Sequence, residues 1–170
     1  ANGLYALVNN SGISGSAPLM HVPMNEVRHM FEVNVFGLLA VTQAFLPLLG
    51  ARTNSPYAPG RIVNISSISG GLVFPFVGAY GGTKHAVEAL TDGLRRELDM
   101  FGIKVISIEP GNIRTPIWEK PSDLDTRYAE TAYAPYLAQM PERLAEMGRK
   151  GAPVELGSRA IYKALIASTG

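Results

Sequence analysis

The stretch Gly60-Arg61-Ile62-Val63-Asn64-Ile65-Ser66-Ser67 decides the fold. Its β-branched apolar residues lie close together, which is typical of a buried strand. Two further short apolar runs, Leu4–Val8 and Lys104–Glu109, end in the turn residues Asn9–Gly12 and Pro110-Gly111. The sequence therefore predicts three strands, each closed by a turn at its carboxyl end.

Helical periodicity fills the two intervals between these strands. Residues Asn25–Leu49 carry apolar side chains at helical spacing, and Tyr80–Met100 has a stripe made of Val87, Leu90, Leu94 and Leu98. Gly102 is expected to end the second helix as its C-cap. Strands that alternate with helices in this way predict an α/β fold whose strands form a parallel sheet.

Residues 115–151 break this alternation. They are rich in proline and aromatic residues and show helical spacing only near Glu142–Arg149. A connection this long in a compact domain is usually functional, so we expect a lid or binding loop at about 115–151 within one domain of residues 1–170. The alternative is a poorly ordered surface insertion. Pro153 is expected to open a last helix that ends near Ala167.

Composition excludes several classes of protein. The 15 Lys and Arg residues nearly balance 14 Asp and Glu residues and form no block, so no nucleic-acid partner is expected. The absence of cysteine excludes disulfides and thiolate chemistry. The 3 histidines lie too far apart for a compact ligand motif, so no metal site is expected. The apolar stretch Val35–Leu49 is interpreted as too short and too polar to span a bilayer.

The chain begins at Ala1, without Met, inside a segment that approaches a strand. The simplest expectation is that the natural N-terminus lies upstream. A targeting or anchor segment would then be missing from this sequence, so the compartment stays open, with the cytoplasm favoured.

Tyr80 and Lys84 lie four residues apart and project from one helix face. An ammonium one turn away is expected to lower the pKa of a phenol from its ordinary value of about 10. Such a phenol can exchange a proton with a carbonyl or alcohol oxygen while a hydride moves at the carbon. The pair alone is more often incidental. Ser67, at the carboxyl end of a strand, is placed to bind the substrate oxygen, or else to cap a turn.

Five motifs together resemble the short-chain dehydrogenase/reductase family in order and spacing. They are Asn10-Ser11-Gly12, Asn34 within Val33–Gly37, Ser66–Gly70, Tyr80–Lys84 and Pro110–Thr115. The resemblance runs from Gly3 to Thr115 and is weaker beyond. It is closest in texture to the branch of retinol, hydroxysteroid and 3-hydroxybutyrate dehydrogenases. Ser11 stands where the family usually has alanine, a change small enough to be tolerated.

The resemblance implies a role for each matching side chain. Tyr80 would be the general acid/base and, with Ser67, would bind the substrate oxygen. Lys84 would lower the pKa of Tyr80 and hydrogen-bond the nicotinamide ribose. Asn34 would complete the catalytic set by holding, through its helix backbone, a water that links Lys84 to solvent. The alternative for Asn34 is a buried polar residue that caps a neighbouring loop.

The resemblance also implies a Rossmann-like doubly wound sheet and a cofactor, NAD or NADP. Asn10, Ser11 and Gly12 would line the adenosine side. The nicotinamide would be wrapped by Pro110, Gly111, Ile113 and Thr115, with Ile113 supplying backbone contacts to its carboxamide. Gly111, which has no Cβ, would let the backbone approach the flat ring closely. The N-terminal strands and the glycine-rich phosphate loop would lie upstream, since no G-x-x-x-G-x-G occurs in the chain. If these 170 residues were the whole product, the first strand would be an open sheet edge and cofactor affinity would be poor.

We therefore expect an oxidoreductase that moves a hydride between a nicotinamide cofactor and a carbonyl or secondary alcohol. The aromatic residues Phe74, Phe76 and Trp118 suggest an apolar substrate. The helices Asn25–Leu49 and Tyr80–Met100 would pair copies into a homodimer or homotetramer, as in the family. The alternative from another class is a catalytically silent nucleotide-binding or scaffold protein. A further enzymatic alternative, an epimerase or dehydratase, fits poorly with the short sequence after Pro110-Gly111.

Overall fold

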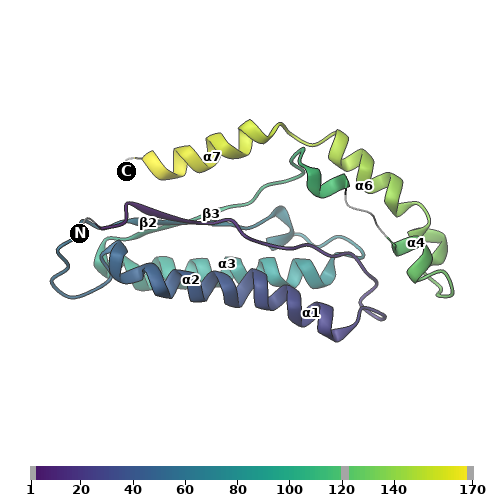
Figure 1. Ribbon diagram of the computed structural model, residues 1–170, viewed down its shortest axis with the longest axis horizontal. Helices are drawn as coiled ribbons and strands as arrows, with labels where there is room; N and C mark the ends of the chain where they lie inside the picture. The colour runs from purple at the N-terminus through teal and green to yellow at the C-terminus, as the bar shows by residue number, and fades with distance from the viewer. Residues whose placement is uncertain (1–2, 120–122, 168–170) are drawn as a thin grey trace.

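A computed structural model describes residues 3–119 and 123–167 of the chain (Figure 1). Within them, β1 (Ala6–Asn9), β2 (Arg61–Ile65) and β3 (Lys104–Ile108) form a parallel sheet in the order β1-β2-β3. Ala6 lies opposite Arg61, and Arg61 lies opposite Lys104. The predicted strands and their parallel arrangement are confirmed.

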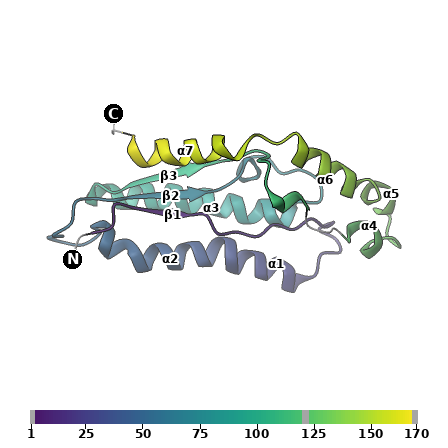
Figure 2. The same cartoon turned by 45° about the horizontal axis from the view of Figure 1, so that its top comes forward.

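Helices cover both faces of this sheet. On one face, α1 (Met24–Phe31), the π-helical turn η1 (Glu32–Gly37), α2 (Leu38–Phe45) and η2 (Leu46–Leu49) follow one another as a single rod. Beside this rod lies α3 (Gly78–Leu98), which η4 (Asp99–Phe101) extends. The opposite face carries α7 (Val154–Ile166), as Figures 1 and 2 show. The sheet is thus the middle of three layers, as a doubly wound fold requires.

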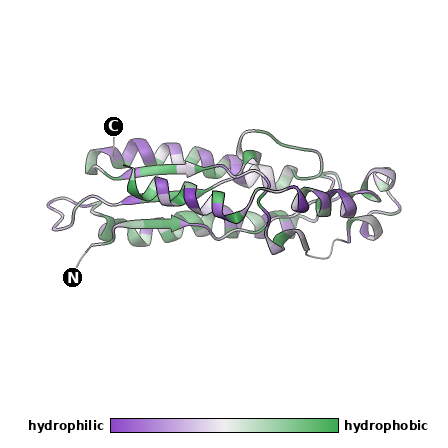
Figure 3. Cartoon of the chain, turned by 90° about the horizontal axis from the view of Figure 1, so that it is seen from above, coloured by the Kyte–Doolittle hydropathy of each residue, from purple (hydrophilic) through white to green (hydrophobic). Residues whose placement is uncertain are grey.

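Gly102 ends the second long helix as predicted. Its φ of 71° lies in the left-handed region, where a residue without Cβ is favoured, and its N–H donates to the Asp99 carbonyl over 2.8 Å. Apolar residues on either side of this turn contribute to the core between the sheet and these helices. The buried members are Leu49, Ile62, Leu98, Ile103 and Val105. The strands carry mostly the apolar colour in Figure 3.

A buried polar network lies between the sheet and its helices. The Asn9 amide donates to the Thr42 hydroxyl and to the Asn64 side-chain carbonyl, each over 2.9 Å. The Asn64 amide in turn donates to the Thr91 hydroxyl over 2.9 Å. Both threonine hydroxyls donate back to their own helices, at the carbonyls of Leu38 and Val87. Because every member is hydrogen-bonded, the network joins β1 and β2 to α2 and α3 without a buried unpaired group.

The C-terminal end of α7 is held by the beginnings of two strands. Arg61 donates to the Ala164 carbonyl over 2.8 Å, and the Tyr5 hydroxyl donates to the Leu165 carbonyl over 2.6 Å. A guanidinium at a helix C-terminus satisfies free carbonyls and opposes the helix dipole. These contacts fix α7 against the edge of the sheet where the strands begin.

The segment predicted as a lid is more helical than its sequence indicates. It contains η5 (Pro116–Glu119), α4 (Leu124–Arg127), α5 (Ala134–Leu137) and α6 (Met140–Arg149). The predicted helix Glu142–Arg149 is part of α6. The others have four residues each, too few to show a helical period.

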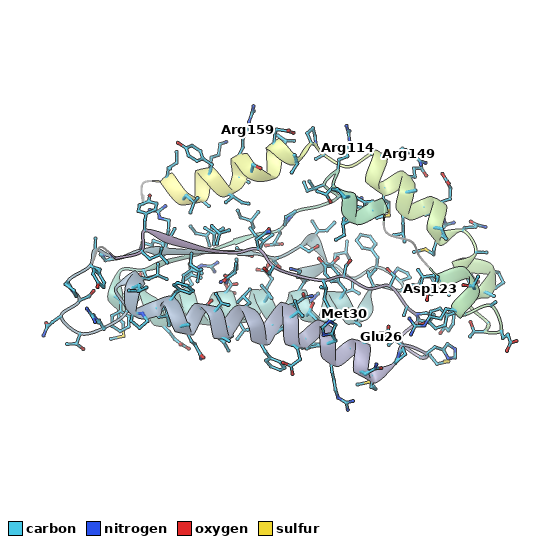
Figure 4. All side chains as sticks on the ribbon, viewed as in Figure 1. Glu26, Met30, Arg114, Asp123, Arg149 and Arg159 are labelled. Atoms are coloured by element: carbon cyan, nitrogen blue, oxygen red, sulfur yellow. The ribbon has the colours of Figure 1, made fainter. Side chains whose placement is uncertain are left out.

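Side chains of this segment form a second small core. Leu124, Tyr128 and Leu137 bury against Ala17, which precedes α1. Arg127 of α4 also pairs with Glu26 of α1, and Figure 4 labels Glu26 and Asp123 at this junction. Residues 115–119 and 123–151 therefore pack against the end of the molecule toward which the strands run (Figure 2). Residues 120–122 lie outside the described residues, and the role as a lid stays a prediction.

The rod Met24–Leu49 corrects one expectation. It is longer than the stretch Val35–Leu49, and by length and composition alone it would be able to cross a membrane. The core helix of a folded domain passes the same test. Here Met30, Val35, Leu38 and Leu49 are buried, which accounts for the apolar composition of the inward side.

Replacing Asn64 with leucine tests the polar network. Asn64→Leu keeps the branched shape of the side chain but removes two buried hydrogen bonds, so the free energy of unfolding should fall by about 1–3 kcal/mol. Urea denaturation of the chain measures this. Ser158→Ala, on the exposed side of α7, is the control and should change the value by less than about 0.5 kcal/mol. An unchanged midpoint for Asn64→Leu would mean that the network contributes no stability.

Candidate active site

Ser67 and Tyr80 meet at the carboxyl end of β2. Ser67 directly precedes the short helix η3 (Ile68–Gly70) and caps it, since its Oγ accepts from the Ser69 N–H over 3.1 Å. Tyr80 lies in the first turn of α3. The Ser67 side chain also acts on the Tyr80 phenol and lowers its pKa. Ser67 is therefore the predicted turn cap and lies beside the phenol, and its binding of a substrate oxygen stays a prediction.

Lys84 lies one turn further along α3 and is 7% exposed. Its Nζ donates to the Ile65 carbonyl over 2.9 Å and lies 5.8 Å from the centre of the Tyr80 ring. Burial lowers the pKa of Lys84, and the negative charge of Glu88 opposes that shift. The carboxyl end of β2 thus orients the ammonium through its last carbonyl.

The pKa of Tyr80 departs from its ordinary value in the direction opposite to the predicted one. Burial raises the pKa of Tyr80, and the hydrogen bond from Ser67 lowers it by less. The expected net decrease is not found, because loss of solvation around the phenol outweighs the contact with Ser67. The effect of Lys84 on the pKa of Tyr80 stays a prediction. A phenol with a raised pKa is protonated at neutral pH and is a weaker acid than a free phenol.

Asn34 lies in the π-helical turn η1 and is 2% exposed. Its side chain exchanges two hydrogen bonds of 2.8 Å with the backbone of Ile13, and its amide donates to the Thr83 hydroxyl over 3.0 Å. Thr83 donates in turn to the Tyr80 carbonyl over 2.7 Å. The side chain thus serves the loop-capping alternative, while the π-helical turn, a feature common at functional sites, leaves the predicted backbone role open.

The turns after β1 and β3 reach the same edge. Asn10, Ser11 and Gly12 are exposed there. A Cβ on Gly12 would lie 3.3 Å from Asn34 Oδ1 and 3.8 Å from Lys84 Nζ, so this backbone passes directly beside the lysine. Their roles toward a cofactor stay predictions.

The turn Pro110–Thr115 is tied to the loop after β2, because the Ile68 N–H donates to the Pro110 carbonyl over 3.0 Å. Gly111 is exposed with open space around its Cβ position, which fits the predicted approach of a flat ring. Ile113 instead turns toward the lid segment: it pairs with Ala152, and its carbonyl accepts from the Trp118 indole over 2.7 Å. The predicted contact from Ile113 to the nicotinamide carboxamide would use the Ile113 N–H, or the Ile113 carbonyl that also accepts from Trp118.

Sequence comparison assigns the family. The family model for short chain dehydrogenases matches residues 1–125, which include the turn after β1, Asn34, Ser67, Tyr80 and Lys84. The chain belongs to the short-chain dehydrogenase/reductase family. These enzymes are NAD(P)-dependent oxidoreductases, as the name of a similar protein also indicates.

Similar proteins support this membership over most of the chain. An NADPH-dependent 3-dehydrocapnine reductase of Ornithobacterium rhinotracheale is 41% identical over 165 residues, which are 97% of this chain and 58% of the relative. Retinol dehydrogenase 16 of Mus musculus is 38% identical over 153 residues, covering 81% of this chain and 46% of the relative. The latter confirms the resemblance to the retinol dehydrogenase branch.

The crystal structure of a short-chain dehydrogenase from Streptomyces avermitilis matches with a TM-score of 0.75 and 32% identity. The match covers 98% of this chain and 58% of that structure. The Rossmann-like fold is therefore confirmed for the residues that the structure describes. The dehydrogenase chain spans a little over half the length of the first of these relatives.

Sequence reasoning missed three polar residues of the site: Thr83, Glu88 and Ser107. Thr83 links Asn34 to the catalytic helix, and the Ser107 hydroxyl donates to Glu88 Oε1 over 2.7 Å. Glu88 stands at i,i+4 from Lys84, the same spacing that pointed to Tyr80 and Lys84. This spacing is the signal that could have found it.

Removing the Ser67 hydroxyl should raise the pKa of Tyr80 further. The hydrogen bond from Ser67 favours the phenolate, so Ser67→Ala leaves burial unopposed, and the phenol should stay protonated to higher pH. NMR titration of the chain with labelled tyrosine, assigned with Tyr80→Phe, measures the shift. Ser158→Ala is the control and should leave the Tyr80 titration unchanged. A lower pKa in Ser67→Ala would contradict the prediction.

Proposed function

We propose that this dehydrogenase chain carries the catalytic centre of an NAD(P)-dependent oxidoreductase that interconverts a carbonyl compound and a secondary alcohol. The observation that carries the proposal is the arrangement of three side chains at the carboxyl edge of the sheet. Ser67 acts on the Tyr80 phenol and lowers its pKa, and the Lys84 ammonium lies 5.8 Å from the centre of the Tyr80 ring. Open α/β sheets bind their ligands at this edge.

Each side chain has one task in the reduction. Ser67 donates a hydrogen bond to the substrate oxygen and holds it beside the phenol. Tyr80 transfers its phenolic proton to that oxygen as the carbonyl carbon gains a hydride. The positive charge of Lys84 stabilises the phenolate that results. The phenol is protonated at neutral pH, so it holds the proton that the reduction consumes.

The nicotinamide cofactor, when bound, supplies or accepts the hydride. The residues present fit its nicotinamide end: Lys84 donates from a buried position, and Gly12 and Gly111 leave backbone exposed beside it. Lys84 would hydrogen-bond the ribose, and the backbone of Pro110–Thr115 would line the ring. No G-x-x-x-G-x-G motif occurs in this sequence, and the proposed cofactor is NAD or NADP.

An apolar substrate is supported by the surroundings of the site. The loop between Ser67 and Tyr80 exposes Leu72, Val73 and Phe74, and the turn before α1 exposes Leu19 and Met20. Large apolar residues that gather at a surface commonly mark a binding site. Similar proteins are named for 3-dehydrocapnine and retinol. We infer an apolar ketone or secondary alcohol as the substrate class.

A silent nucleotide-binding or scaffold protein is the alternative function. Such a protein would not need an acid, an oxygen-binding hydroxyl and a buried cation to lie side by side. The placement of Ser67 and the buried Lys84 ammonium around the Tyr80 phenol favours the enzyme, because a protein without this chemistry gains little from burying a cation beside a phenol.

Association of copies is a further part of the proposal. The outward side of α1–α2 exposes Phe36, Val41 and Phe45. An apolar stripe of this kind is costly in water and is buried when a second copy packs against it. We infer a homodimer, or a homotetramer built from it, through this helix pair and α3.

Tyr80→Phe tests the mechanism. In the longest available form of the protein, the substitution should lower kcat by a factor of about 100 or more, since it removes the only proton that the mechanism supplies. NADPH fluorescence, read in the same samples, should show nearly unchanged cofactor affinity. Tyr162→Phe on the exposed side of α7 is the matched control and should be fully active. Near-normal turnover of Tyr80→Phe would refute the mechanism and favour the scaffold.

A charged side chain on the outward face of α2 tests the association. Phe45→Lys should convert the dimer or tetramer to a monomer in light scattering, because the new charge would be buried without a partner. Tyr162→Lys, which is equally drastic but lies on α7, should leave the oligomeric state unchanged. A wild-type chain that is monomeric at high concentration would contradict the proposed interface.

A further inference from the structure

Lys84 carries its charge in an unfavourable place. Its side chain is 7% exposed, and the Ile65 carbonyl is the group to which Nζ donates among the described residues. An ammonium has three N–H groups and loses much solvation energy on burial. A buried cation in this position needs a compensating negative charge.

Glu88 is placed to supply that charge. It lies one helical turn after Lys84 on α3, so both side chains belong to the same helix face. From β3, the Ser107 hydroxyl donates to Glu88 Oε1 over 2.7 Å. The carboxylate is therefore held at a fixed point between helix and sheet instead of turning to solvent.

Gly70, at the end of η3, packs closely against α3 and the end of β2. A Cβ on Gly70 would lie 2.9 Å from Glu88 Cγ, 3.0 Å from Ser66 Oγ and 3.3 Å from the Lys84 carbonyl. The Ser66 hydroxyl is buried and has no hydrogen-bond partner among the described residues. Glu88 therefore packs closely under η3, near the backbone of Lys84 and next to the Ser66 hydroxyl, which has a hydrogen to donate.

No other charged side chain of the described residues competes for this role. On α3 itself, Tyr80 is the other titratable group that faces Lys84. The packed elements contribute neutral groups: Ser66 and the Ile65 carbonyl from the end of β2, Ser69 from η3, Ser107 from β3 and Asn34 from η1. The field that acts on Lys84 comes from Glu88.

We propose that Glu88, held by Ser107, is a positioning residue that supplies the counter-charge for the buried Lys84 ammonium. The inference deepens the proposed function and rests on it for the catalytic meaning of Lys84, though not for the charge pairing itself. Glu88 touches neither substrate nor cofactor in this scheme and acts only through Lys84.

The sign of the effect follows from the two opposing shifts. Burial lowers the pKa of Lys84 and Glu88 raises it. Removing the negative charge leaves burial unopposed, so the ammonium is lost at a lower pH. If Lys84 acts as proposed, the alkaline limb of the pH–rate profile moves to lower pH with it.

The direct test is NMR titration of Lys84 in the 170-residue chain, with lysine labelled at Cε and the signal assigned with Lys84→Arg. Glu88→Gln removes the charge but keeps an oxygen that can accept from Ser107. The Lys84 titration should shift to lower pH in Glu88→Gln, less so in Ser107→Ala, and should return toward wild type in Glu88→Asp. Glu97→Gln, at an exposed position of the same helix, should not shift it. A Lys84 titration that is the same in Glu88→Gln and wild type overturns the proposal.

Kinetics of the longest available protein separate this inference from the proposed function. Glu88→Gln should lower kcat by about tenfold, the size of a strong pairwise coupling, with little change in KM. The alkaline limb should move to lower pH. A shifted Lys84 titration with unchanged kinetics supports the counter-charge and refutes the catalytic role of Lys84. A Glu88→Gln variant with the unfolding midpoint of wild type excludes a merely structural effect.

Discussion

Parallel pairing of three strands is the constraint on which the rest of the structure depends. Since β1, β2 and β3 run in one direction, the turns that follow them meet at one edge. The Asn9–Asn64 hydrogen bond joins two of the strands below the sheet, and Thr42 and Thr91 join that pair to the helices. A slip of β1 by one residue against β2 would turn Asn9 away from the helices and break the network. Register and site geometry are therefore fixed by the same contacts.

Burial acts on the two titratable groups of the site in opposite directions. It makes the Tyr80 phenol a weaker acid and the Lys84 ammonium a stronger one. Each is opposed by one neighbour, Ser67 for the phenol and Glu88 for the ammonium. The site therefore balances solvation loss against individually placed polar groups, and its acid–base behaviour depends on side chains that lie outside the Tyr-x-x-x-Lys pair.

Much of this arrangement could be predicted from the sequence. Strands and long helices follow from apolar periodicity, and Ser67, Tyr80 and Lys84 converge because a strand end and a helix start must meet in a parallel fold. The π-helical turn at Asn34 was missed, because one wider turn hardly changes an apolar stripe. The inward-facing Asn64 and Thr91 find partners only in three dimensions. The net direction of the Tyr80 pKa shift was mispredicted, because burial is a property of the folded chain.

The pairing of Ile113 with Ala152 has a consequence for ligand affinity. These two residues lie at the beginning and end of the long segment of residues 115–151, and their backbones are hydrogen-bonded through Asn112 and Arg114. Joining the ends of a flexible segment costs configurational entropy that grows with the logarithm of its length. In this protein, the pairing of Ile113 with Ala152 makes that entropy loss part of folding. Should the segment act as the predicted lid, its closure over a ligand would cost correspondingly less entropy.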